Sequence, residues 1–170
     1  MKKLWSPFAI TIFLIVFTNG ILAQTTQTKL NQVELMKQFV GTWQMSDSTV
    51  TVNYSKDTIQ VWEVQQYGKA FLIISYFKIN GKKSFESINN LVYSKDDKFK
   101  GFTSWSRGGY MTQISSFTSE KKITGIWVRN FNPETIVEKF EIVFYTNSLT
   151  ISEFTPSGEK TREYRFIKVN

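Results

Sequence analysis

The pattern of hydrophobic and polar positions changes once along the chain, from a helical period to a strand period. The segment 31–40 places its apolar side chains on one helical face: Val33, Met36, Phe39 and Val40. Gly41 then ends the helical pattern. After it, segments rich in Val, Ile, Thr and aromatic residues alternate with turn signals at intervals of about 10 to 14 residues. The pattern predicts one short helix followed by an antiparallel meander, since short hairpins join antiparallel neighbours.

The number of strands depends on how one tripeptide is interpreted. Turn signals occur at residues 55–57, 67–68, 80–81, 94–97, 108–109, 119–120, 131–134, 146–147 and 156–159. If Ser46–Ser48 is also a turn there are eleven strands, whereas a bend or bulge in one long first strand (41–54) gives ten. An even number lets the first and last strands close antiparallel. We therefore expect an all-β, ten-stranded up-and-down barrel. An internal cavity is expected as well, because side chains just fill the interior of a barrel of about eight strands, and ten strands enclose more space.

The first 23 residues have the pattern of an export signal. Lys2 and Lys3 precede the predominantly apolar run Phe8–Phe17, and Ala23 offers a small residue before the predicted cleavage point. A run of this length is short of the roughly 20 residues that cross a bilayer. We expect residues 24–170 to be one exported domain, periplasmic or secreted in a bacterium, with no transmembrane span once the signal is removed.

Composition excludes several chemistries. The 170 residues contain no Cys and no His, which rules out a thiol nucleophile, disulfides, a Cys/His zinc site, His-ligated haem and a Ser-His-Asp relay. We expect neither a metal nor another cofactor. The chain has 21 Lys and Arg against 14 Asp and Glu, and these charges are scattered instead of forming a basic stripe, so no nucleic-acid partner is expected.

The alternation of side chains can be followed across the hairpins to predict which face points inward. From 136 to 144 the even positions are mostly apolar, and the odd positions include Lys139 and Glu141. Continuing this face through the turns gives further inward residues on five other segments: Leu149, Ile151 and Glu153; Arg162, Tyr164 and Phe166; Ile123, Gly125, Trp127 and Arg129; Tyr110, Thr112 and Ile114; Phe99, Gly101, Thr103 and Trp105. Before Phe99 the register is left open, because a loop longer by one residue would invert the face.

Four charged residues fall on this otherwise apolar face: Arg129, Glu138, Glu153 and Arg162. Antiparallel pairing places Glu153 opposite Arg162 and Trp127 opposite Glu138, with all four charges near one barrel end. Buried charge must be paired, hydrated or met by a ligand. The cluster is then either a salt-bridged plug or a polar mouth that receives an anionic head group. The candidate ligand-binding residues are Arg162, Tyr164, Arg129, Glu138, Glu153, Trp127, Trp105 and Tyr110; no catalytic residue is assigned.

Two short motifs carry a family resemblance. A helix followed by Gly41-Thr-Trp43 and a meander to the C-terminus resembles the lipocalin-like (calycin) barrels, most of all the secreted lipocalin-like domain proteins of bacteria. The resemblance implies that Trp43 closes the barrel floor beneath Arg165 or Lys168. Arg162-Glu-Tyr164 is similar to the Arg-x-Tyr with which fatty-acid-binding proteins hold a ligand carboxylate. The two helices that those proteins insert between their first strands have no counterpart here.

Three functions remain open on the sequence. The favoured one is an exported lipocalin-like protein that binds a small hydrophobic or amphipathic molecule, with an anion as one option. The second is an enzyme that uses Glu138 or Glu153 as a general acid or base. The third is an interaction module with a filled barrel and an outer apolar patch around Phe102 and Phe154.

Overall fold

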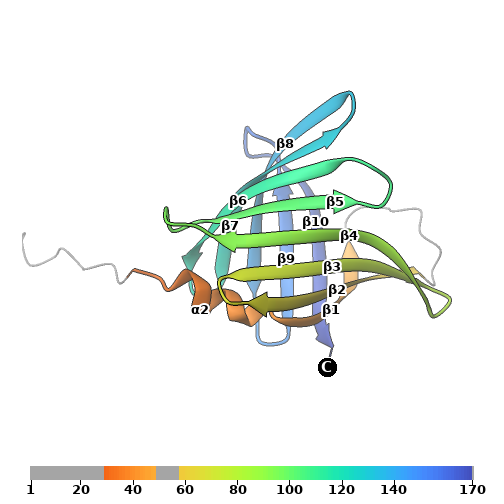
Figure 1. Ribbon diagram of the computed structural model, residues 1–170, viewed down its shortest axis with the longest axis horizontal. Helices are drawn as coiled ribbons and strands as arrows, with labels where there is room; N and C mark the ends of the chain where they lie inside the picture. The colour runs from red at the N-terminus through yellow and green to blue at the C-terminus, as the bar shows by residue number, and fades with distance from the viewer. Residues whose placement is uncertain (1–28, 49–57, 170) are drawn as a thin grey trace, which may run out of the picture.

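The computed structural model describes residues 29–48 and 58–169, which form one closed barrel of ten strands (Figure 1). Each strand pairs antiparallel with its neighbours in sequence, and β1 pairs with β10 to close the ring. The strands are β1 (Gly41–Ser48), β2 (Thr58–Tyr67), β3 (Ala70–Ile79), β4 (Lys82–Tyr93), β5 (Phe99–Trp105), β6 (Tyr110–Ser119), β7 (Lys122–Phe131), β8 (Glu134–Phe144), β9 (Ser148–Phe154) and β10 (Lys160–Val169). The predicted up-and-down barrel is confirmed.

The ambiguous tripeptide is a bulge and not a turn. Pairing of β1 with β10 shifts register between Met45 and Asp47, and β1 continues to Ser48. This is the ten-strand alternative, in which an extra residue bends one long strand. The predicted signal at 1–23, the continuation of the first strand to residue 54 and the turn at Ser55–Asp57 lie outside the described residues.

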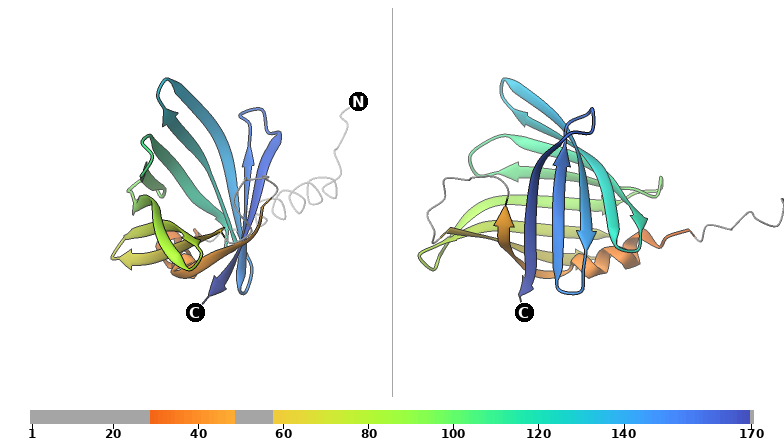
Figure 2. Two further views of the ribbon diagram at one scale, coloured as in Figure 1. Left: turned by 90° about the vertical axis from the view of Figure 1, so that its right-hand side faces the viewer. Right: turned by 180° about the vertical axis from the view of Figure 1, so that it is seen from behind.

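One short helical segment covers one end of the barrel. It consists of α2 (Gln32–Met36) and the 3-10 turn η1 (Lys37–Phe39). Asn31 caps it by accepting a hydrogen bond from the amide of Glu34 at 3.2 Å. We call this the helix end; the β8–β9 turn and the C-terminus lie there too (Figure 2). The opposite end, where the β5–β6, β7–β8 and β9–β10 turns lie, is called the loop end. Among the described residues, no helix has the length and apolar character needed to cross a membrane.

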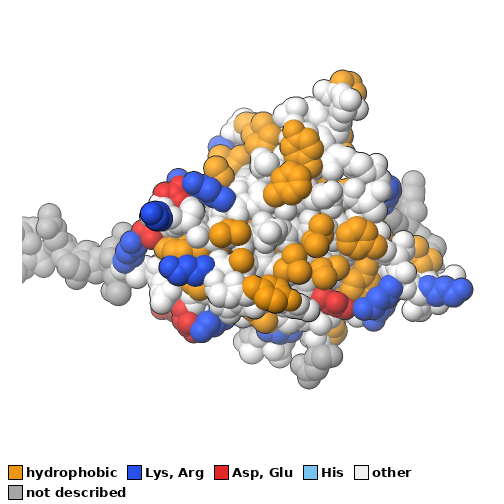
Figure 3. All heavy atoms as spheres, viewed as in Figure 1, with side chains coloured by type: hydrophobic (Ala, Val, Ile, Leu, Met, Phe, Trp, Pro, Cys, Tyr) orange, Lys and Arg blue, Asp and Glu red, His pale blue; other side chains and the backbone are white. Residues whose placement is uncertain are grey.

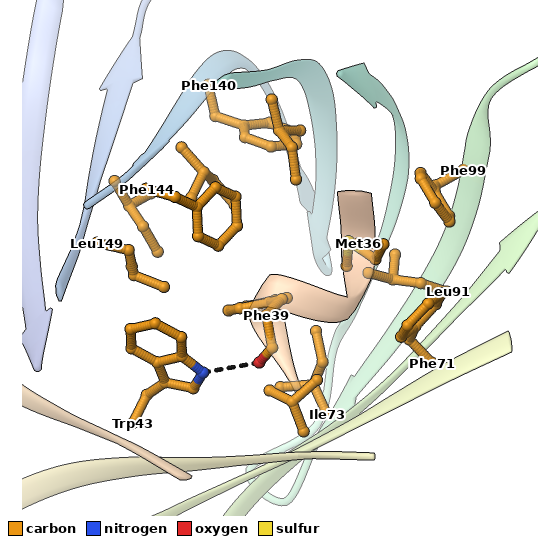
Figure 4. Close-up of a cluster of buried hydrophobic side chains, with 14 of the residues drawn as sticks. Met36, Phe39, Trp43, Phe71, Ile73, Leu91, Phe99, Phe140, Phe144 and Leu149 are labelled. Atoms are coloured by element: carbon orange, nitrogen blue, oxygen red, sulfur yellow. Dashed lines mark hydrogen bonds between the residues drawn. The ribbon is translucent and has the colours of Figure 1, made fainter. Parts of the chain in front are cut away.

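The helix end is closed by aromatic packing around Trp43 (Figure 4). Trp43 is fully buried, and its indole Nε1 donates to the carbonyl oxygen of Phe39 at 2.7 Å. Phe39 in turn packs edge-on against Phe144 with ring centroids 5.8 Å apart. Above the indole, Lys168 Nζ lies 5.2 Å from the ring centroid, a distance at which a cation is attracted by the aromatic face.

The helix is also tied to β6 through a buried glutamine. Gln32 Nε2 donates to the carbonyl oxygen of Phe117 at 3.1 Å, and the amide of Phe117 donates back to Gln32 Oε1 at 2.6 Å. The two bonds lie beside the point where the β6–β7 register shifts, between Phe117 and Ser119. They satisfy the backbone of Phe117 with a side chain from the helix, which fixes the helix against β6.

This bulge overturns the predicted inward face of β6. Tyr110, Thr112 and Ile114 were expected inside, yet all three are exposed, and the intervening residues are buried: Met111, Gln113, Ser115 and Phe117. The turn occupies residues 120–121, one position later than expected, and the extra residue of the bulge adds a further shift. On β5 the predicted face is correct, since Phe99 and Thr103 are buried. The β5–β6 connection also pairs in a register different from the expected one, which inverts the face a second time and returns β5 to its predicted orientation.

We predict that Trp43→Phe lowers the free energy of unfolding by about 1–3 kcal/mol, because the buried carbonyl of Phe39 loses its donor. Trp105→Phe makes the same chemical change at a half-buried indole for which no hydrogen bond is found among the described residues, and serves as the control. Urea unfolding followed by circular dichroism measures both. Equal losses in the two variants would contradict the importance of this bond.

Candidate functional site

The barrel encloses a cavity of about 440 Å³. At the helix end it is bounded by the buried side chains of Met36 and Phe39. At the loop end it is bounded by Phe131, Ile136 and Arg162, whose side chains are each more than a third exposed. The cavity therefore has a closed floor at the helix end and faces solvent at the loop end.

Most of the cavity wall is apolar, and all ten strands contribute side chains to it. Its volume falls in the range of about 300–1,000 Å³ in which small-molecule pockets lie. The large apolar side chains of the wall are Met45, Trp62, Ile73, Leu91, Trp105, Met111, Ile123, Trp127, Phe140, Ile142, Ile151 and Phe166. Aromatic pairs give this wall fixed shape: Trp127 stacks on Phe140 with centroids 4.2 Å apart, and Trp62 lies 4.3 Å from Phe166.

The four predicted charges converge as expected on the inner face near the loop end. Strand register places Glu153 opposite Arg162 and Glu138 opposite Trp127. Arg129 is the centre of the cluster: it donates to Glu138 through Nη1 and to Glu153 through Nη2, the second bond being 2.6 Å long. Both carboxylates are almost completely buried. Arg129 is thus bound by two buried carboxylates, as such burial of charge requires.

Arg162 stands in a different environment from Arg129. Its side chain is 43% exposed and makes a 3.3 Å contact with Glu153, which Arg129 already holds, and it also forms a hydrogen bond with Tyr164. Tyr164, two positions along β10, also lines the cavity. Burial, assisted by the negative charge of Glu153, raises the pKa of the Tyr164 phenol, so this hydroxyl remains protonated and able to donate a hydrogen bond at physiological pH.

The two remaining predicted contacts have different outcomes. Trp105 lines the cavity and stacks on Phe131 at 5.0 Å, near the loop end. Tyr110 does not line it: the ring lies outside and stacks on Phe102 with centroids 5.7 Å apart. The prediction for Tyr110 is wrong because of the offset at the β6–β7 hairpin. Phe102 is exposed as predicted, and Phe154 is half-buried.

An inward polar group on β2–β4 was missed by the sequence analysis. Glu86 Oε2 accepts hydrogen bonds from Ser75 Oγ at 2.6 Å and from Gln60 Nε2 at 2.7 Å, and all three residues line the cavity. The β3–β4 register shifts between Ser75 and Tyr76, which leaves Glu86 as an extra residue between Phe85 and Ser87. Both Glu86 and Ser87 consequently contribute to the wall. Simple alternation cannot place two consecutive residues on one face.

Three buried polar atoms within the described part of the chain have no hydrogen-bond partner: Asn89 Oδ1, Thr103 Oγ1 and Trp127 Nε1. All three belong to residues that line the cavity. Asn89 and Thr103 are directly opposite each other on β4 and β5. Buried polar groups in proteins are normally satisfied, so these atoms are available to a molecule in the lumen, whether water or ligand.

The outer surface offers a second, less structured feature. Exposed apolar side chains gather on the outer face of β4–β6, where Figure 3 shows hydrophobic groups close together. They are Ile88, Val92, Phe102, Tyr110 and Ile114. The lumen is the stronger candidate, because there a cavity and convergent polar groups occur together.

Over the residues that the structure describes, no three acidic side chains gather in a way that would hold a metal ion. Compared with known proteins, the sequence matches no protein-family model and no curated protein. The fold and the site together define the class: a closed ten-stranded antiparallel barrel with a floor, an apolar lumen and polar groups toward one end.

We predict that Arg129→Met destabilises the protein by about 3–5 kcal/mol, because it leaves Glu138 and Glu153 buried without their main partner. Arg162→Met should cost less than about 1 kcal/mol, since this arginine is partly exposed and its acceptor is already paired. Thermal and urea unfolding of the two variants measure the difference. Similar losses for both would show that Arg129 is not the centre of the cluster.

Proposed function

We propose that this protein is an exported, lipocalin-like carrier that binds a small hydrophobic or amphipathic molecule inside its barrel. The observation that carries the proposal is the 440 Å³ lumen, in which a mostly apolar wall includes polar atoms that no described residue pairs. Pockets for small molecules combine these two properties, apolar area for affinity and a few polar groups for orientation.

Lipocalin-like character is supported by the helix end. Gly41-x-Trp43 stands where the resemblance requires it, after a short helix and at the start of β1. Of the two candidates for the basic residue above the tryptophan, Lys168 lies over the indole ring. Gly41 has φ of +129° and its Cα is close to the Lys168 side chain, so that a Cβ would meet Lys168 Cε at 2.8 Å. Glycine thus suits both the backbone and the close approach.

Binding is favoured over acid–base catalysis by the pairing of the two inward carboxylates. Glu138 and Glu153 both accept from Arg129, and Glu153 also contacts Arg162. A general acid or base needs a carboxylate that is free to exchange a proton with a substrate, whereas both of these carboxylates are already bound by guanidinium donors. The same pairing keeps Arg129 from serving as a free anion receptor. Export rests on the pattern of residues 1–23, and it places the carrier in the periplasm or outside the cell.

The test is saturable binding of a neutral solvatochromic dye such as Nile red, measured by its fluorescence. We expect one site per barrel, and Thr103→Trp should weaken binding by about tenfold or more, because the indole would occupy the lumen. Ser104→Trp, at the next position but facing outward, is the matched control and should bind as the parent does.

Circular dichroism establishes that both tryptophan variants remain folded. If the parent shows no saturable dye binding, or if Ser104→Trp weakens binding as much as Thr103→Trp, the lumen is not the binding site. Native mass spectrometry of protein purified from its own host gives an independent answer, as an added mass that disappears in Thr103→Trp.

A further inference from the structure

The charges on the inner face at the loop end are unbalanced. Two cations, Arg129 and Arg162, face three carboxylates, Glu86, Glu138 and Glu153. The ion pairs described above use both arginines and two of the carboxylates. Glu86 forms no ion pair among the described residues, so within that part of the chain one carboxylate of the inner face has no cation beside it.

Glu86 is held in place by neutral donors only. Gln60 and Ser75 both donate to Oε2, and no described residue donates to Oε1. The bulge in β4 aims this side chain at the lumen, together with Ser87. A carboxylate that is fixed in direction, lines a cavity and lacks a cation is complementary to a positively charged donor.

Unpaired acceptors lie on the same part of the wall. Thr103, only 4% exposed, has a hydroxyl without a partner, and Asn89 opposite it on β4 has a free amide oxygen. This is independent of the charge argument, because neither residue is ionisable. An ammonium group carries three N–H donors and no acceptor, which matches a wall of one carboxylate and two neutral acceptors.

Aromatic surface adjoins these acceptors. Trp105, on β5, is directly opposite Ser87 of β4 and stacks on Phe131. Trp62, on β2, also lines the cavity. Indole faces attract cations, and the apolar wall further inside suits a hydrocarbon chain. A carboxylate ligand would instead add a negative charge to an end that already has an excess of one.

We propose that the ligand of this barrel is an amphipathic amine, whose protonated nitrogen lies against Glu86 near Asn89 and Thr103 and whose apolar part fills the aromatic lumen. This rests on the proposed lumenal binding and specifies its ligand class. It reverses the charge expected from the Arg162-x-Tyr164 motif, since the arginines of this site are already balanced by Glu138 and Glu153.

Displacement of Nile red by three ten-carbon probes tests the proposal: decylamine, decan-1-ol and decanoate. With the parent protein, decylamine should displace the dye at a concentration about tenfold lower than decan-1-ol, the expected gain from a charge-assisted hydrogen bond, and decanoate should be the weakest. Stronger displacement by decanoate, or equal displacement by decylamine and decan-1-ol, overturns the proposal while leaving lumenal binding intact. Failure of Nile red itself to bind contradicts the carrier function instead.

Glu86→Gln then assigns the effect to one residue. It should remove about tenfold from the decylamine affinity, a clearly larger loss than for the dye or decan-1-ol, which carry no charge for Glu86 to receive. Glu141→Gln is the matched control, because Glu141 lies on the outer face in an ion pair with Lys122. If Glu86→Gln has no effect on decylamine, or weakens all three molecules equally, Glu86 is structural and does not receive the amine.

Discussion

Closure of the barrel by the β1–β10 pair is the constraint on which the other features depend. Once the first and last strands are hydrogen-bonded, every strand has two partners and every side chain points either into the lumen or to the outside. Ten strands enclose more space than the inward side chains fill, and the helical segment with Trp43 occupies only one end of it. The cavity is thus a consequence of strand number together with one plugged end.

Within this frame, the charged residues have two separate roles. Arg129, Glu138 and Glu153 form a buried network of ion pairs. Removal of one member leaves the charge of its partners buried without compensation, which destabilises the fold. Glu86, Asn89 and Thr103 form the opposite case, polar groups on the lumenal wall with capacity to spare. Function is better sought where hydrogen-bonding capacity is unused than where charges are most numerous.

Much of the inner surface could be predicted from the sequence. The alternation along 136–144 and its continuation through two short turns placed Glu138, Glu153 and Arg162 correctly, because a two-residue side-chain period transfers across a hairpin whose loop length is known. Tyr110 was misplaced because it lies beyond the β6–β7 bulge. Glu86 was missed because it is itself the extra residue of the β4 bulge, on a strand whose inward face the alternation left open. A bulge adds a residue without changing the local composition that marks strands and turns.

The sequence alone determined the class of fold and the inward face of five of the ten strands, β5 and β7–β10, since these follow from local periodicity and turn chemistry. Tertiary structure decided the bulges, the pairing of Arg129 with two glutamates and the isolation of Glu86 from any described cation. These depend on which side chains from distant strands meet across the lumen and on where a ladder absorbs an extra residue. Both are settled by three-dimensional packing and hydrogen-bond satisfaction, which no single strand encodes by itself.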